Sequence, residues 1–198
     1  MTISDLFNEL ANKDFQDPAT GNLFFPAYIF AYAPEEEYMI RREIEELKDR
    51  LIRPDNYVDC LIMNIFNEFV EFLKSQTVAK QPLFDQIVDE EEKEPQEMYD
   101  LLIEKAHSNA FLNFIHEKTA RHFSNQGKFE RVYLMIHGFG TIFPYLRTSE
   151  FLKNYESFLS GADYKLITFF PGNYENGNYE LFGQFHDENI YRATLINN

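Results

Sequence analysis

The chain has 198 residues, a formal net charge of −15, a hydrophobic content of 44%, and 21 Phe and 12 Tyr residues. This length is typical of one domain, and the apolar content is sufficient for a hydrophobic core, which excludes a wholly disordered chain. The strong negative charge argues against direct binding of nucleic acid, because contact with a phosphate backbone requires clustered Lys and Arg.

Further absences limit the class of protein. No window approaches the ~18 apolar residues of a membrane-spanning helix. The first residues, MTISDLFNELANKDF, lack the basic start of a signal peptide and instead predict a short amphipathic helix. The single cysteine, Cys60, excludes an internal disulfide and is either a buried inert thiol or a reactive one. We therefore expect a cytoplasmic protein that does not bind membranes.

In the first part of the chain, a predicted strand is followed by a short connection and a helix, and this unit occurs twice. Residues 23–33, LFFPAYIFAYA, form an apolar run typical of a strand buried on both faces. Residues 34–51 predict a helix, because Pro34 suits the first helical position and the acids that follow favour the helix N-terminus. Residues 56–66 and 67–76 predict the second strand and the second helix.

A helical insert of about residues 80–126 follows. Pro95 precedes a helical pattern from about 96 to 123, which fits either one long helix or two helices with a break near 108–109. Residues 84–100, FDQIVDEEEKEPQEMYD, carry eight acids and one Lys. This acidic stretch is either a solvated surface or an electrostatic docking surface for a basic partner, which would mainly raise the association rate.

The last part of the chain returns to strands. Residues 131–138, RVYLMIHG, and 163–172, DYKLITFFPG, predict buried strands, and 144–159 predict the helix between them. The tail, 178–196, predicts two short strands about a polar turn. We therefore predict a single α/β domain over residues 1–198, with a mainly parallel sheet of about four to six strands flanked by helices.

Ligands of an open parallel sheet bind beyond the carboxyl ends of its strands. The segments YAPEEE, MNIFN, HGFGTIFPYLR and FPGNYENG each follow a predicted strand and would meet at that edge. The arginine in the apolar tail segment IYRATLI must also find a carboxylate or carbonyl partner. The candidate edge for binding a ligand or a partner consists of Tyr32, Glu35, Asn64, His137, Gly138, Gly140, Arg147, Gly172, Asn173 and Arg192.

No catalytic motif accompanies this edge. HGFGTIFPYLR has no Lys for a P-loop, and Phe143 occupies the third glycine position of a dinucleotide fingerprint. A nucleophile elbow and a metal-ligand spacing of histidines are also missing, so we predict no catalytic residue, metal or cofactor. Gly138 and Gly140 are expected to let the strand turn sharply into a helix. Arg147 either forms an ion pair with an acid among Glu35 to Glu37 or binds an acidic group of a ligand or partner.

Four blocks of the sequence resemble the BrxB family, a small component of the BREX bacteriophage-exclusion systems of bacteria and archaea. They are YIFAYAPEEEYMIRREIEELKDRL, HGFGTIFPYLRTSEFLKNYESFL, ITFFPGNYENGNYELFG and ENIYRATLI. The sequence departs from the family pattern at Ala33 and Asn173, where an acid is usual. Both changes remove a carboxylate from the predicted edge, which puts acid–base or metal chemistry there in doubt.

The resemblance implies a part in phage defence and in the methylation that marks host DNA. It implies a non-enzymatic subunit that supports the assembly or activity of the PglZ and methyltransferase machinery through contacts with a PglZ-like protein and other BREX components. The alternative is a degenerate α/β domain that senses a phosphate-bearing small molecule at the sheet edge, with Arg147 as its anion-binding residue. A nuclease or phosphatase would need a carboxylate cluster at that edge.

Overall fold

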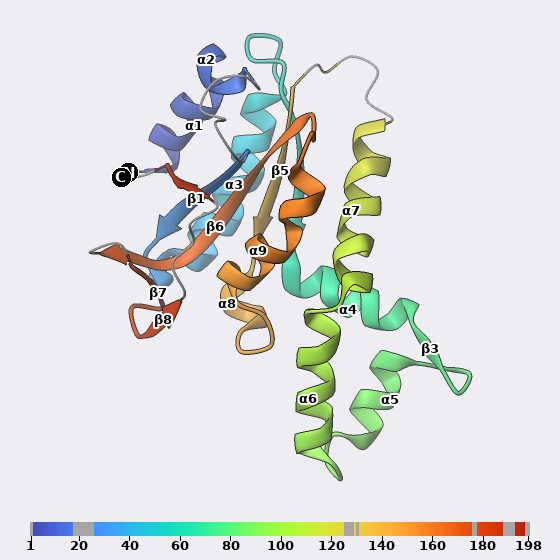
Figure 1. The fold of residues 1–198 in the computed structure, drawn as a ribbon. Coiled ribbons are helices and arrows are strands. Elements are labelled where there is room, and N and C mark those ends of the chain that lie inside the picture. The colour runs from blue at the N-terminus through green and yellow to red at the C-terminus, as the bar shows by residue number, and fades with distance from the viewer. Residues whose placement is uncertain are drawn as a thin grey trace.

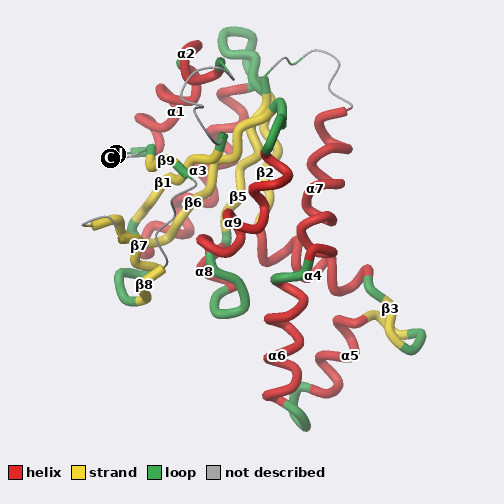
Figure 2. The backbone as a smooth tube through the Cα atoms, viewed as in Figure 1, coloured by secondary structure: helices red, strands yellow, loops and turns green. Residues whose placement is uncertain are grey.

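The computed structural model describes residues 2–17, 26–124, 129, 131–175, 178–187 and 193–196. All its described strands except β3 and β4 form a central layer with helices on both sides (Figure 1), and Figure 2 shows the same layers by type of element. The helices are α1 (Ile3–Ala11), α2 (Lys13–Gln16), the short 3-10 helix η1 (Pro34–Glu36), α3 (Glu37–Leu51), α4 (Ile65–Ser75), α5 (Leu83–Glu90), α6 (Pro95–Ala106), α7 (Asn109–Ser124), α8 (Phe139–Ile142) and α9 (Thr148–Leu159). The strands are β1 (Ala27–Tyr32), β2 (Asp59–Asn64), β3 (Thr77–Val78), β4 (Gln81–Pro82), β5 (Val132–His137), β6 (Tyr164–Glu175), β7 (Asn178–Leu181), β8 (Phe185–Asp187) and β9 (Thr194–Leu195).

The central sheet is mixed, and the prediction of a mainly parallel sheet was wrong. Within the described residues it has seven strands, of which β2, β5, β6, β1 and β9 lie side by side in that order and pair in parallel. β7 pairs antiparallel with the end of β6, and β8 pairs antiparallel with β7. The reason is the length of β6, which continues to Glu175 instead of ending near residue 172. β7 follows after two residues, and so short a connection joins only antiparallel strands.

The two faces of the sheet bury two separate hydrophobic clusters. Helices α1 and α3 cover one face, where Leu6 and Ile44 pack against Phe30 and Phe169 of the strands. Helices α4, α7, α8 and α9 cover the other face. Because successive residues of a strand point to opposite faces, a strand covered on both sides reads as a continuous apolar run, as the sequence indicated.

The helix predicted after the first strand is confirmed. It consists of η1 and α3, with Pro34 at the first position, and it buries a stripe of aliphatic residues at helical spacing against the sheet. Cys60, at the second position of β2, is fully buried, and this burial raises the pKa of its thiol. The thiol is therefore the inert, buried one of the two alternatives.

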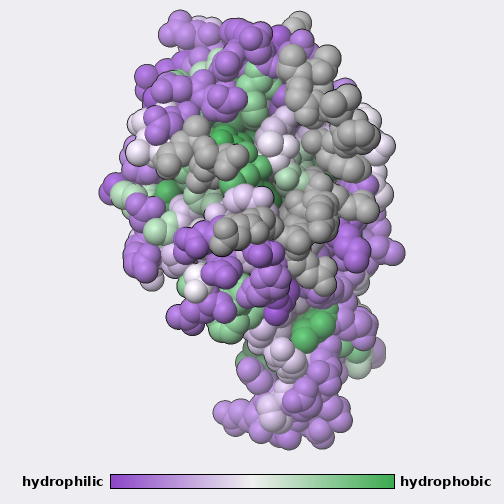
Figure 3. All heavy atoms as spheres, turned by 60° about the vertical axis from the view of Figure 1, so that its left-hand side comes forward, coloured by the Kyte–Doolittle hydropathy of each residue, from purple (hydrophilic) through white to green (hydrophobic). Residues whose placement is uncertain are grey.

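The hairpin β3–β4, which the sequence did not predict, leads into the insert, and three helices follow it. Of the two alternatives for residues 96–123, the broken helix is the one observed: α6 ends before His107, and Ser108 accepts a hydrogen bond from the backbone N–H of Phe111 at 3.2 Å. α5 and α6 project from the body, and Figure 3 shows that the surface of this projection is mainly hydrophilic. That the chain is a single domain with an insert stays a prediction.

Within the described part of the chain, no helix combines the length and the apolar character needed to cross a bilayer.

Candidate functional site

The parallel pairing brings several of the predicted residues to one edge of the sheet. Tyr32 is paired with Pro171, directly before Gly172, and Asn64 is paired with His137. These residues end β1, β2 and β5, so the carboxyl ends of three strands and the continuing β6 meet at this edge. That a ligand or partner binds at this edge remains a prediction.

The glycines of the β5–α8 turn have a geometric role. Gly138 has a φ of +90°, and a Cβ at this position would lie 2.7 Å from the side-chain oxygen of Asn64. That oxygen accepts hydrogen bonds from the backbone N–H groups of Phe66 and Asn67 and so caps α4. A Cβ on Gly140 would lie 2.8 Å from the ring of Phe182. The turn therefore carries the chain tightly from β5 into the short helix α8.

The helix predicted over residues 144–159 begins later than expected. α8 ends at Ile142, a turn follows, and α9 starts at Thr148. The carboxylate of Glu150 accepts a hydrogen bond from the backbone N–H of Arg147 at 3.3 Å, which marks Arg147 as the residue before the first helical turn. Arg147 thus lies at the start of α9 and not within a helix.

A polar network closes the edge on the side of α3. The hydroxyl of Tyr32 donates a hydrogen bond to one carboxylate oxygen of Glu37. Nε of Arg41 donates a hydrogen bond to the other oxygen of Glu37 at 2.6 Å. Arg41 in turn donates from Nη2 to the hydroxyl of Thr141 on α8, at 3.0 Å. The network links β1, α3 and α8, and its charged groups are neutralised within the chain.

The imidazole of His137 lies beside this network and is 9% exposed. Burial, assisted by the positive charge of Arg41, lowers the pKa of His137 to about 4. Its Nδ1 has no hydrogen-bond partner among the described residues. Burial also raises the pKa of Tyr32, and the neighbouring Glu37 carboxylate adds to that effect. Both groups are therefore neutral at pH 7, which suits a structural role better than proton transfer.

The remaining predicted residues lie apart from this network. Glu35 is exposed on η1. Arg147 donates from Nη1 to the carbonyl oxygen of His186 at 2.7 Å, so the expectation that it pairs with one of the acids from Glu35 to Glu37 was wrong. The reason is that α9 starts late, which places the guanidinium over β8. Arg192 lies outside the described residues.

A shallow pocket of about 380 Å³ lies where β6 runs past the end of β1. Tyr32, Gly172 and Asn173 line it together, as the sequence analysis expected of a common edge. Its other described lining residues are Ala31, Ala33, Tyr174, Glu175 and Leu195. None of these described residues carries a positive charge, so the pocket offers a phosphate group no charged partner.

An aromatic–arginine surface (Phe143, Arg147, Phe182, Phe185) lies on the other side of the edge. The ring of Phe143 is 5.0 Å from that of Phe185 and 6.3 Å from that of Phe182, measured between centroids. The guanidinium carbon of Arg147 lies 5.7 Å from the centre of the Phe143 ring. Phe185 is 42% exposed. Two sequence blocks, around HGFGTIFPYLR and NYELFG, thus come together at one partly exposed surface.

Sequence reasoning missed the residues that close the edge. Glu37 and Arg41 are four residues apart on one helix, a spacing that signals an ion pair, and this signal could have been used. The contact of Arg41 with Thr141 joins residues 100 positions apart, and no local pattern reveals it. Within the described ranges, no group of three or more His, Cys, Asp or Glu side chains could hold a metal ion.

Comparison with known proteins identifies the family. The family model for BREX protein BrxB matches residues 61–196. The chain is also 24% identical over 169 residues to a BREX protein BrxB of Bacillus cereus (strain H3081.97), an alignment that covers 85% of this chain and 82% of that relative. No solved structure matches it. Because the family model spans more than half of the chain, the protein belongs to the BrxB family and is a component of a BREX system.

Proposed function

We propose that this protein is a non-enzymatic subunit of a BREX antiphage system, which supports the assembly or activity of the PglZ and methyltransferase machinery by binding a PglZ-like protein. The observation that carries this proposal is the closed state of the sheet edge. Tyr32, Glu37 and Arg41 are bonded to one another and to α8, and no positively charged residue among those described lines the adjacent pocket. An edge of this kind is better suited to holding a shape than to binding and converting a substrate.

The aromatic–arginine surface is the part of the edge best suited to a protein partner. Aromatic residues and arginine are enriched at the centres of protein interfaces and contribute much of their binding energy. Phe185 is 42% exposed, and Arg147 lies over Phe143 beside it. All four residues of this surface lie within residues 61–196, the part that the family model matches.

Co-purification with the PglZ-like protein of the same BREX system tests this proposal. Phe185→Ser is expected to weaken the complex about tenfold or more, because it removes an exposed aromatic anchor. Tyr38→Ser is the matched control, since Tyr38 is 86% exposed and lies on α3, which covers the opposite face of the sheet. Its affinity should stay within about twofold of the wild type.

Failure of the two proteins to associate at any salt concentration would contradict the proposal. Calorimetric titration with a panel of nucleotides tests the alternative, a sensor of a phosphate-bearing small molecule. Binding that is abolished by Arg147→Ala would favour the sensor over the assembly subunit.

The acidic residues of the α5–α6 projection provide a second contact for a basic partner. Glu91 and Glu92 are exposed in the turn between the two helices. If this projection steers association, the double substitution Glu91→Lys and Glu92→Lys should lower the association rate with the PglZ-like protein about fivefold at low salt and leave the dissociation rate nearly unchanged. Stopped-flow mixing at two ionic strengths measures both rates. An unchanged association rate at low salt would show that the acidic stretch is only a solvated surface.

A further inference from the structure

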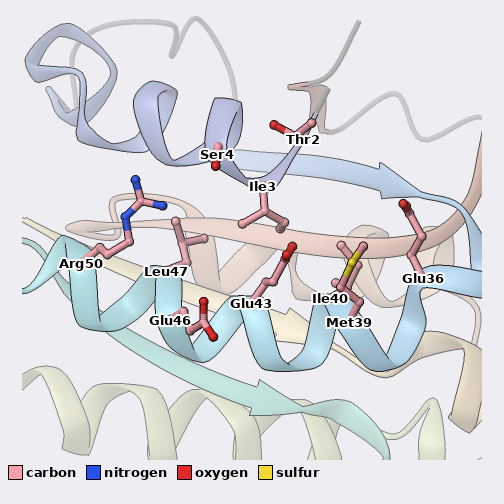
Figure 4. Close-up of a pocket in the computed structure, with 10 residues that line it drawn as sticks. All are labelled: Thr2, Ile3, Ser4, Glu36, Met39, Ile40, Glu43, Glu46, Leu47 and Arg50. Carbon is pink, nitrogen blue, oxygen red and sulfur yellow. The ribbon is translucent and has the colours of Figure 1, made fainter.

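A groove of about 270 Å³ lies between the N-terminal end of α1 and the helix α3 (Figure 4). We call it the α1–α3 groove, and its lining residues are Thr2, Ile3, Ser4, Glu36, Met39, Ile40, Glu43, Glu46, Leu47 and Arg50. These residues precede residue 61, so the groove lies outside the part of the chain that the family model matches. It is also separate from the aromatic–arginine surface, because α3 covers the opposite face of the sheet.

The floor of the groove is apolar. Ile3, Ile40 and Leu47 line it with exposures of 9%, 3% and 1%, because they belong to the hydrophobic cluster that joins α1 to α3. Met39 is 40% exposed beside them and presents a flexible thioether to the solvent. Methionine adapts its shape to different apolar partners, which is the property of a surface that receives another side chain.

The rim of the groove is acidic. Figure 4 shows Glu36, the last residue of η1, and Glu43 of α3 on the side that faces α1. Neither forms an ion pair with another described residue. Glu46 is 3.8 Å from Arg42, but both side chains are about two-thirds exposed or more, so this pair holds the carboxylate only weakly.

The one basic residue of the lining does not neutralise this rim. The guanidinium of Arg50 lies 3.6 Å above the ring of Phe7, at one end of the groove. The other end therefore presents carboxylates above an apolar floor, in a chain whose net charge is already −15.

We propose that the α1–α3 groove docks a basic amphipathic segment of a partner protein, with an apolar side chain of that segment on the floor and its Lys or Arg side chains on Glu36 and Glu43. These two glutamates are seven positions apart in the sequence, which corresponds to about 10 Å along a helix. Cations placed two turns apart on a docked helix would match this spacing. Charge complementarity decides among occupants: a second copy of this acidic chain, a nucleic acid and an anionic membrane would all be repelled.

The test uses the full-length protein and a synthetic probe. The probe is a fluorescent amphipathic helical peptide of Leu and Lys, and its counterpart carries Glu in place of each Lys. We expect the Lys peptide to bind with an affinity that falls at least about tenfold in the double variant Glu36→Lys, Glu43→Lys. The matched control is Glu45→Lys, Asp49→Lys, which makes the same change of net charge on exposed positions of α3 that do not line the groove.

The control should weaken binding by no more than about twofold. Methyl NMR locates the peptide independently: the signal of Met39 should shift on titration, whereas that of Met63, which is 1% exposed, should not. Equal weakening by both double variants, binding of the Glu peptide, or an unmoved Met39 signal would each overturn the proposal. These outcomes leave the PglZ test untouched, because that test probes the opposite face.

Discussion

Replacing Gly172 by alanine is expected to destabilise the protein by about 3 kcal/mol, the upper end of the usual cost of overpacking. A Cβ at this position would lie 2.1 Å from the backbone carbonyl oxygen of Glu180, because Gly172 is paired with Leu181 where β6 and β7 approach each other. The obstacle is backbone, so it cannot move aside as the end of a flexible side chain would. Denaturant unfolding of the purified variant measures the loss.

Gly161→Ala is the matched control for this substitution. Gly161 has a φ of +76°, and its added Cβ would meet nothing within 4 Å. It should therefore cost only the backbone strain of a left-handed alanine, about 1 kcal/mol. Because β7 is followed by Phe182 and Phe185, Gly172→Ala should also weaken binding of the PglZ-like protein. A Gly172 variant as stable as the Gly161 variant would mean that β6 and β7 are not so closely paired.

Acidification is expected to destabilise the protein through His137. Its pKa in the folded state is about 4, below the usual value of 6.5. The unfolded chain therefore binds the proton more readily, so the contribution of the neutral imidazole is fully present above pH 6.5 and is lost as the pH falls toward 4. This difference between the pKa values of the folded and the unfolded state lowers the free energy of unfolding by about 3 kcal/mol between pH 6.5 and pH 4.

The substitution His137→Gln isolates this contribution from the many carboxylates that titrate in the same range. The free energy of unfolding of the variant, relative to the wild type, should rise by about 3 kcal/mol between pH 7 and pH 4. His186→Gln is the control for the loss of an imidazole, because His186 is exposed on β8, and it should change the free energy of unfolding at pH 7 by no more than about 0.5 kcal/mol. Urea titrations at several pH values measure both. A His137 variant whose difference from the wild type does not change with pH would show that the imidazole is accessible to protons.

Much of the sheet edge followed from the order of segments. An apolar run followed by an amphipathic helix predicts a strand that feeds a crossover, and strands joined by crossovers lie parallel and end at the same edge. This order of segments predicts that Tyr32, Asn64, His137 and Gly172 lie together, and the strand pairing places them at one edge. The sequence predicts this arrangement because the alternation of apolar strands and amphipathic helices is visible in neighbouring residues.

The partners of the charged residues could not be predicted in the same way. One of the two readings of Arg147 had it pair with an acid of η1 or α3. Instead, a turn of a few residues delays the start of α9, and the Arg147 guanidinium donates to the carbonyl oxygen of His186. Small changes in where a helix begins rotate every side chain that follows, by about 100° per residue. The sequence does not specify such boundaries closely enough to select a partner.

By itself, the sequence determined the alternation of strands and helices, the absence of recognised catalytic motifs and the resemblance to BrxB, because periodicity, composition and short motifs are properties of neighbouring residues. Only the tertiary structure decided that the sheet is mixed, that Arg41 reaches Thr141 and that Phe143 meets Phe185. These contacts join residues from 42 to 100 positions apart. Their formation depends on the length of β6 and on the packing of whole elements, which no local pattern encodes.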